Sequence, residues 1–217
     1  MELRRAISSN SLMLGLFALL TTAAIAATYL GTRDAIAAQE KAAKAKALLQ
    51  ILPAQQHDNS MLDDTLPVTD SNLLTLDEPG QIFVARKAGK ATAFIIPSIA
   101  PDGYSGAIRV LTGVMRDGTV AGVRVVAHNE TPGLGDKVDL KKSDWILDFN
   151  GTSLDNPAPS GWKVKKDGGR FDQFTGATIT PRAVTQAVYQ TLLYYQQQQK
   201  TLLEQTEPHA PEDNNHG

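Results

Sequence analysis

Two short segments of the sequence combine residue types that could serve chemistry. In the first, residues 128–137, a proline is followed by two glycines around a leucine, in the run Glu130-Thr131-Pro132-Gly133-Leu134-Gly135. Such a run favours a tight loop whose backbone can approach a ligand closely. It could equally be a plain connection between a strand and a helix, with Glu130 and Asp136 capping a helix or facing solvent. The residues alone leave both interpretations open.

The second segment, residues 171–181, places small and hydroxyl-bearing residues directly before an expected helix. The N-terminus of a helix offers free N–H groups and partial positive charge, and both favour phosphate. Alternatively, the hydroxyls of Thr175, Thr178 and Thr180 only satisfy those free donors. We expect Thr180 to be the N-cap and Pro181 the first helical residue, since both types are favoured at these positions.

Composition narrows the chemistry that these segments could perform. The 217 residues include no cysteine, which excludes disulfides, thiolate zinc sites, cysteine-ligated iron–sulfur clusters and cysteine nucleophiles. A net charge of −2 excludes the strongly basic composition of a nucleic-acid binder. We expect no metal site, and any redox chemistry would depend on a bound organic cofactor.

An uncharged run of 27 residues, 6–32, lies between two arginines near the N-terminus. A membrane-spanning helix needs roughly 20 apolar residues, so this run predicts a transmembrane anchor. The alternative is a cleaved signal peptide, because Ala24-Ile25-Ala26 has the form of a cleavage site. The length of the run, and its continuation through Thr28-Tyr29-Leu30, favour a retained anchor.

The charges around this run do not by themselves fix its orientation. Arg4 and Arg5 favour a cytoplasmic N-terminus, but Arg33 and three lysines follow the span closely. Long domains cross the membrane largely regardless of charge. We therefore expect the folded domain to lie outside the cytoplasm.

The rest of the chain predicts an α+β domain with an antiparallel-rich sheet and flanking helices. Strand patterns and turn residues predict two hairpins, one around residues 87–90 and one around Asp117-Gly118. A short helix at 141–149, a short strand at 161–165 and a final helix from Pro181 are also expected. In the final helix, Val184, Val188 and Leu192 share one face.

We divide the chain accordingly into four parts. These are an N-terminal tail and anchor at 1–33, a helical and polar connecting segment at 34–80, the folded domain at 81–200, and a disordered acidic tail at 201–217.

Taken together, the two segments resemble the membrane-anchored FMN-binding subunits of bacterial respiratory complexes. The resemblance rests on the first run and on Asp172-x-x-Thr175-Gly176-Ala177-Thr178. It is strongest to the G subunits of Rnf (or Rsx) electron-transport complexes, supported by residues 101–108, 143–146 and 164–169. The C subunits of sodium-pumping NADH:quinone reductases are similar around both motifs, so that membership is the alternative.

This resemblance implies a cofactor and its attachment site. FMN would be bound through its phosphate to Thr178 as a phosphoester, made by a separate Mg-dependent flavin transferase that uses FAD. Asp172, Thr175, Gly176 and Ala177 would complete the sequence that the transferase recognises. The residues implied near the flavin are Glu130, Thr131, Gly133, Leu134 and Gly135.

The resemblance also implies a function. The chain would carry electrons within an inner-membrane complex that couples ferredoxin and NAD redox chemistry to ion translocation, with its domain on the periplasmic side. Its partners would be the other membrane subunits. No independent catalysis is expected from this chain. It would not pump ions by itself, because a single membrane span offers no ion pathway. A hypothesis of another class is a non-redox anchored domain that binds a ligand or protein, and a colourless purified protein would favour it.

Overall fold

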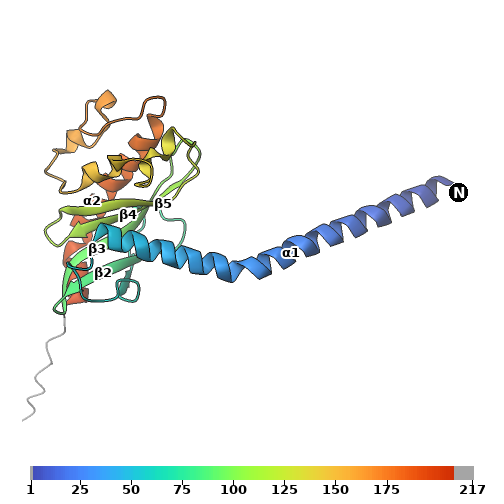
Figure 1. The fold of residues 1–217 in the computed structure, drawn as a ribbon, viewed down its shortest axis with the longest axis horizontal. Helices are drawn as coiled ribbons and strands as arrows, with labels where there is room; N and C mark the ends of the chain where they lie inside the picture. Colours follow the sequence, from blue (N-terminus) through green and yellow to red (C-terminus); the bar gives the residue numbers. More distant parts are fainter. Residues whose placement is uncertain (1, 208–217) are drawn as a thin grey trace, which may run out of the picture. The chain divides into compact units, whose positions relative to one another are not determined.

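The computed structural model describes residues 2–207, which belong to two compact units. The first unit ends at Lys44 and the second begins at Ala45. Helix α1, Glu2–Ile51, crosses this boundary, so only its last turns belong to the second unit. The second unit contains all the strands described and the long helix α2, Ile179–Thr206 (Figure 1).

Helix α1 includes a stretch that is long and apolar enough to cross a membrane. Its large apolar side chains are exposed, as expected of a helix that contacts lipid. They include Leu12, Met13, Leu14, Phe17, Leu19 and Leu20. The helix continues through the alanine-rich residues and ends at Ile51, two residues before Pro53, a residue type that cannot continue a helix.

Five strands form one antiparallel sheet, in the order in which they follow one another along the chain. They are β1 Thr65–Pro67, β2 Gln81–Lys87, β3 Lys90–Ala100, β4 Ile108–Met115 and β5 Val120–Ala127. Both expected hairpins are present, since Lys87 pairs with Lys90 and Gly118 turns the second with a φ of 88°. The predicted α+β fold with an antiparallel sheet is confirmed.

The last turns of α1 cover one face of the sheet (Figure 1). Leu48 and Ile51 are buried there against strand residues. A Cβ added to Gly113 would lie 2.3 Å from Ile51 Cγ2, and one on Gly122 would lie 3.3 Å from Ile51 Cα. The two glycines therefore let the helix end approach β4 and β5 closely.

Arg124 of β5 secures this helix end. Its guanidinium donates to the Gln50 carbonyl at 2.9 Å and to Gln50 Oε1 at 3.2 Å, and only 7% of the residue is exposed. Burial lowers the pKa of this arginine from its usual value. The free carbonyls at a helix C-terminus carry partial negative charge, so they stabilise the buried cation.

Helix α2 covers the opposite face of the sheet. The predicted stripe of Val184, Val188 and Leu192 is fully buried in the main core, as are Phe94 and Ile96 of β3. α2 lies along β3 and β4, and its N-terminus comes after the loops that follow β5.

The structure corrects two of the expected boundaries. The folded unit begins at Ala45 rather than 81, because the end of α1 packs on the sheet and β1 pairs with β2. Residues 201–206 are helical, although we expect a disordered tail from 201. Leu202 and Thr206 are buried, and Arg86 donates to the Thr206 carbonyl at 2.6 Å, so tertiary contacts extend the helix. The remainder of the expected tail, residues 208–217, lies outside the described residues.

The segment between β5 and α2 contains short 3-10 helices rather than a further strand. The expected strand at 161–165 is wrong: its only strand-like contact among the described residues is an isolated parallel bridge between Val164 and Phe171. The expected short helix carrying Trp145 is present. The four 3-10 helices are Gly135–Val138, Asp144–Phe149, Pro159–Gly161 and Lys165–Asp167.

Candidate functional site

Three hydrogen bonds to one backbone carbonyl hold the loop after β5 in a tight turn. The Thr131 carbonyl accepts from the N–H groups of Leu134, Gly135 and Asp136 at 3.1, 3.1 and 3.4 Å. The buried Asp136 carboxylate accepts from the Gly133 N–H at 2.8 Å, and Gly133 has a φ of 78°. A positive φ is readily adopted by glycine, so this residue type suits the turn.

Glu130 lies at the centre of the site and is only 4% exposed. One carboxylate oxygen, Oε1, accepts from the Ser105 N–H at 2.9 Å. The other, Oε2, accepts a short hydrogen bond from the Thr180 hydroxyl. These bonds join three segments: the loop between β3 and β4, the loop after β5, and the first turn of α2. We call Glu130, Ser105 and Thr180 the carboxylate clasp.

Gly135 must lack a side chain for this clasp to form. A Cβ at Gly135 would lie 2.6 Å from Glu130 Oε2 and 2.7 Å from Thr180 Oγ1, which is closer than a real Cβ contact. The second glycine of the loop therefore leaves space for a carboxylate and a hydroxyl. The first glycine, Gly133, serves the turn.

The second segment forms a tight turn before α2. The Ala177 N–H donates to the Phe174 carbonyl at 3.1 Å, and Gly176 has a φ of 81°. A Cβ on Gly176 would lie 3.6 Å from Leu134 Cδ2, so the two segments are in contact here as well as at the clasp. Thr175 and Gly176 are exposed and Ala177 is half-buried.

Thr178 occupies the N-cap of α2, which corrects the expected assignment of Thr180. The helix begins at Ile179, and Thr178 has helical backbone angles, φ −82° and ψ −26°. Its side chain makes no capping hydrogen bond, and the residue is half-buried. Thr180 is fully buried, and its hydroxyl bonds Glu130 instead of a free helix N–H. The Thr178 hydroxyl is therefore not engaged in capping.

An aromatic cluster packs against residues 171–174, which lead into this turn. Phe149 stacks on Phe171 with ring centroids 4.4 Å apart, and Trp145 meets Phe174 edge-on at 5.1 Å. Trp145 Nε1 also donates to the Asp172 carbonyl at 2.8 Å. These contacts fix the backbone of residues 171–174, because each ring has few alternative positions in a packed core.

Asp172 itself points to solvent. Its side chain is 58% exposed and forms an ion pair with Lys165 at 2.6 Å. It does not belong to the clasp and does not cap the turn by any hydrogen bond found in the described residues. Its carboxylate is thus accessible to another protein.

Three exposed apolar residues lie next in sequence to residues at or beside the clasp. Tyr104 precedes Ser105, Leu134 precedes Gly135, and Ile179 precedes Thr180 along the chain. Because Ser105 and Thr180 bond Glu130 and Gly135 lies against it, the backbones of the three apolar residues lie close to the clasp. The three apolar residues are 68%, 42% and 44% exposed. Tyr104, Ser105 and Ile179 lie next to the motifs or in the supporting run 101–108, but only the fold brings them together.

The residues present fit a flavin phosphate bound at Thr178. The threonine offers an uncommitted hydroxyl at the N-terminus of a long helix, where free N–H groups favour an anionic oxygen. The exposed Tyr104, Leu134 and Ile179 offer apolar surface to a flat ring system. No group of three or more His, Asp or Glu side chains that could hold a metal occurs in residues 2–207.

Fold and site together define a flavin-binding domain carried on an apolar N-terminal helix, and sequence comparison agrees. The FMN-binding domain family matches residues 103–193, which include the clasp and Thr178. The RnfG N-terminal region family matches residues 1–51, which are the whole of α1 and its preceding residue.

The chain belongs to the family of G subunits of ion-translocating oxidoreductase complexes. The family member from Pseudomonas aeruginosa is 50% identical over 210 residues, covering 97% of this chain and 95% of that relative. The member from Shewanella loihica is 45% identical over 201 residues, covering 93% and 95%. That from Vibrio vulnificus is 46% identical over 200 residues, covering 92% and 94%. The predicted resemblance to Rnf-type G subunits is confirmed.

We predict that Thr180→Val destabilises the protein far more than Thr178→Val. Valine keeps the shape of threonine but leaves Glu130 Oε2 buried without its donor, which costs about 1–3 kcal/mol. Thr178 has no capping hydrogen bond to lose, so its replacement should change the free energy of unfolding by less than about 0.5 kcal/mol. Denaturant unfolding of the flavin-free proteins measures both. Equal losses would show that the clasp contributes nothing beyond an ordinary helix start.

Proposed function

We propose that this chain carries FMN bound covalently at Thr178 and passes electrons within a membrane complex of the ion-translocating oxidoreductase type. The observation that carries the proposal is the Thr178 hydroxyl, which lies at the start of α2 without a capping bond, beside the clasp and its exposed apolar side chains. The FMN-binding family match over residues 103–193 supports the cofactor, and the G-subunit relatives support the complex.

Attachment is a transfer of the FMN moiety from FAD. The Thr178 oxygen forms a bond to the FMN phosphorus, and the bond between that phosphorus and the bridging oxygen of the pyrophosphate breaks. AMP leaves, and the hydroxyl proton passes to a base of the transferase. Among the described residues, no histidine or lysine forms a hydrogen bond with the Thr178 hydroxyl, so this chain provides no base of its own. This supports modification by a separate enzyme.

The chain's own residues then hold and orient the cofactor. The N–H groups at the start of α2 stabilise the phosphate charge, and the clasp fixes that helix start against both loops. Leu134, Tyr104 and Ile179 present apolar surface for the ring. When bound, FMN supplies the capacity to accept and release electrons, and the protein supplies position and electrostatics.

The proposed function also implies a location in the membrane and a set of protein partners. The apolar stretch of α1 serves as a retained anchor in the inner membrane, and the flavin domain lies on the periplasmic side. The partners are the remaining membrane subunits, which supply the ion pathway and the exchange of electrons with ferredoxin and NAD. The flavin transferase is a transient partner during maturation.

We predict that Thr178→Val abolishes covalent flavin while Thr175→Ser retains it. Thr175 belongs to the same exposed turn and to the sequence that the transferase would recognise, and serine keeps its hydroxyl, so this variant controls for a change in the turn. Peptide mass spectrometry after expression with the transferase should find the FMN mass on Thr178 of the wild-type chain. Covalent flavin on another residue would disprove the site, and a colourless wild-type protein would favour the non-redox binding domain.

A second pair of variants tests the role of Asp172. If the transferase reads its carboxylate, Asp172→Asn should lower flavin loading at least tenfold, while Lys165→Gln should leave loading near the wild-type level. Both substitutions break the same 2.6 Å ion pair, which is solvent-exposed and adds little to stability. In-gel flavin fluorescence measures loading, and thermal unfolding checks the fold. Similar losses in the two variants would assign Asp172 to the ion pair alone.

The orientation can be tested with fused reporters. A reporter active only in the cytoplasm should be silent when joined to the C-terminus, and one active only in the periplasm should be active. Activity of the cytoplasmic reporter would reverse the proposed orientation. Absence of residues 1–26 from the mature protein would show that the apolar stretch is a cleaved signal.

A further inference from the structure

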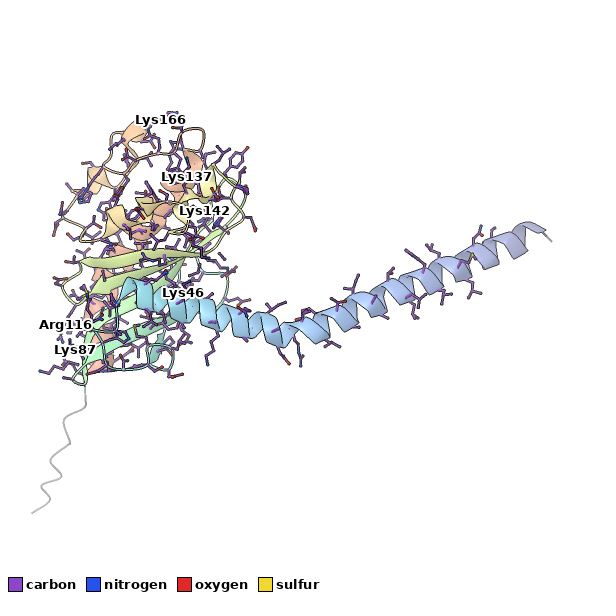
Figure 2. The ribbon with its side chains drawn as sticks, viewed as in Figure 1. Lys46, Lys87, Arg116, Lys137, Lys142 and Lys166 are labelled. Atoms are coloured by element: carbon purple, nitrogen blue, oxygen red, sulfur yellow. The ribbon has the colours of Figure 1, made fainter. Side chains whose placement is uncertain are left out.

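Cationic side chains gather around the turn that precedes α2. Between residues 161 and 182 there are five lysines and arginines against two aspartates, although the whole chain has a net charge of −2. The cations are Lys163, Lys165, Lys166, Arg170 and Arg182. Figure 2 shows Lys166 at the end of the second unit where Lys137 and Lys142 also lie, opposite the end with Lys87 and Arg116. The segment that leads into α2 and contains Thr178 therefore carries a net positive charge.

Both aspartates of this region hold a cation. Lys165 pairs with Asp172, and Arg182 pairs with Asp167 through two hydrogen bonds of 2.6 and 3.0 Å. The hydrogen bond from Arg182 holds the pKa of Asp167 below its usual value, and the positive charges of Lys166 and Lys163 add to this effect. The Arg182 and Asp167 side chains are 48% and 33% exposed, so solvent can reach the pair.

Arg182 lies one helical turn after Thr178. The Arg182 N–H donates to the Thr178 carbonyl at 3.3 Å, which confirms helical spacing between them. Residues four apart are neighbours on a helix surface. A long helical side chain covers the turn that precedes its own Cα, so the turn that begins at Thr178 is within reach of the Arg182 side chain, whose guanidinium bonds Asp167 in this structure.

We propose that Arg182 is the counter-ion of the phosphodiester on Thr178, and that Asp167 holds the guanidinium in place until the flavin is attached. The proposal rests on the proposed attachment at Thr178. A phosphodiester carries about one negative charge at neutral pH and accepts bidentate hydrogen bonds from a guanidinium. Because the phosphate is tethered one turn away, it competes for Arg182 at high effective concentration.

The exchange replaces one bidentate partner of Arg182 by another. Solvent reaches the pair with Asp167, so both groups can be hydrated when the pair opens. The new partner lies at the helix N-terminus, where the phosphate also meets free N–H groups. Lys165 is less suited to this role, since a lysine binds phosphate as a point charge and not through a bidentate pair of N–H groups.

Nuclear magnetic resonance of the full chain in detergent tests the exchange. The ³¹P resonance of the phosphodiester should shift in Arg182→Gln, shift less in Arg182→Lys, and stay unchanged in the matched control Lys165→Gln. The Asp167 carboxylate, followed by ¹³C titration, should have a higher pKa in the flavin-loaded chain than in the flavin-free chain. Lys163 and Lys166 remain near Asp167, so its pKa should rise only part of the way to the usual value.

The outcomes separate this proposal from the proposed function. If mass spectrometry finds no FMN on Thr178, both fail. The FMN could instead be on Thr178 while Arg182→Gln leaves the ³¹P resonance unchanged and the Asp167 pKa is the same in the flavin-loaded and flavin-free chains. In that case only the role of Arg182 fails. Asp167→Asn is a second variant that keeps the proposal testable if Arg182→Gln does not fold. It frees the guanidinium without removing it, and its ³¹P resonance should therefore differ from that of Arg182→Gln.

Discussion

The arrangement of the site depends on one buried carboxylate. Glu130 is almost fully removed from solvent, and a buried carboxylate is tolerated only when its oxygens are hydrogen-bonded. Its two oxygens take their donors from segments 25 residues before and 50 residues after it in the sequence. Satisfying this one side chain therefore fixes the loop after β5, the β3–β4 loop and the start of α2 relative to one another.

The rest of the second unit provides a rigid base for this clasp. α2 is held along the sheet by its buried stripe and at its far end by Arg86, while the aromatic cluster supports the turn before it. On the other face of the sheet, Arg124 binds the carbonyl end of α1. Rigidity at the base matters because an electron carrier must present its cofactor at a defined place, and small displacements at a site are costly.

Local patterns predict the elements of this fold well, but they do not predict the pairing of buried polar groups. Alternating strands, Asp117-Gly118 and the stripe from Val184 to Leu192 are read from neighbouring residues, and the structure contains the corresponding elements. Thr180 shows the limit: threonine before proline is a favoured N-cap, yet its hydroxyl bonds a carboxylate 50 residues away. A distant partner outweighs a local preference because leaving Glu130 unsatisfied would cost more than leaving a cap position unfilled.

The residues of the candidate site likewise differ in how far the sequence predicts them. The motif around Thr178 is visible in the sequence through its family resemblance, whereas only burial makes Glu130 central. Tyr104 and Ile179 carry no signal by themselves, because an exposed apolar residue is ordinary until the fold gathers several at one point.

The open surface around Thr178 gives a physical reason for the proposed covalent bond to the cofactor. A cavity of about 360 Å³ does exist in the second unit, but Lys90, Arg116 and Thr206 line it, and Arg116 lies at the end opposite Lys166 (Figure 2). Thr175 and Gly176 are exposed, so the turn does not enclose a ligand in the way that retains a small molecule without a bond. The proposed tether would replace that enclosure, since it would keep the flavin at high local concentration whatever its intrinsic affinity. The ring would then rest on the apolar surface of Leu134, Tyr104 and Ile179 and remain accessible to electron-transfer partners.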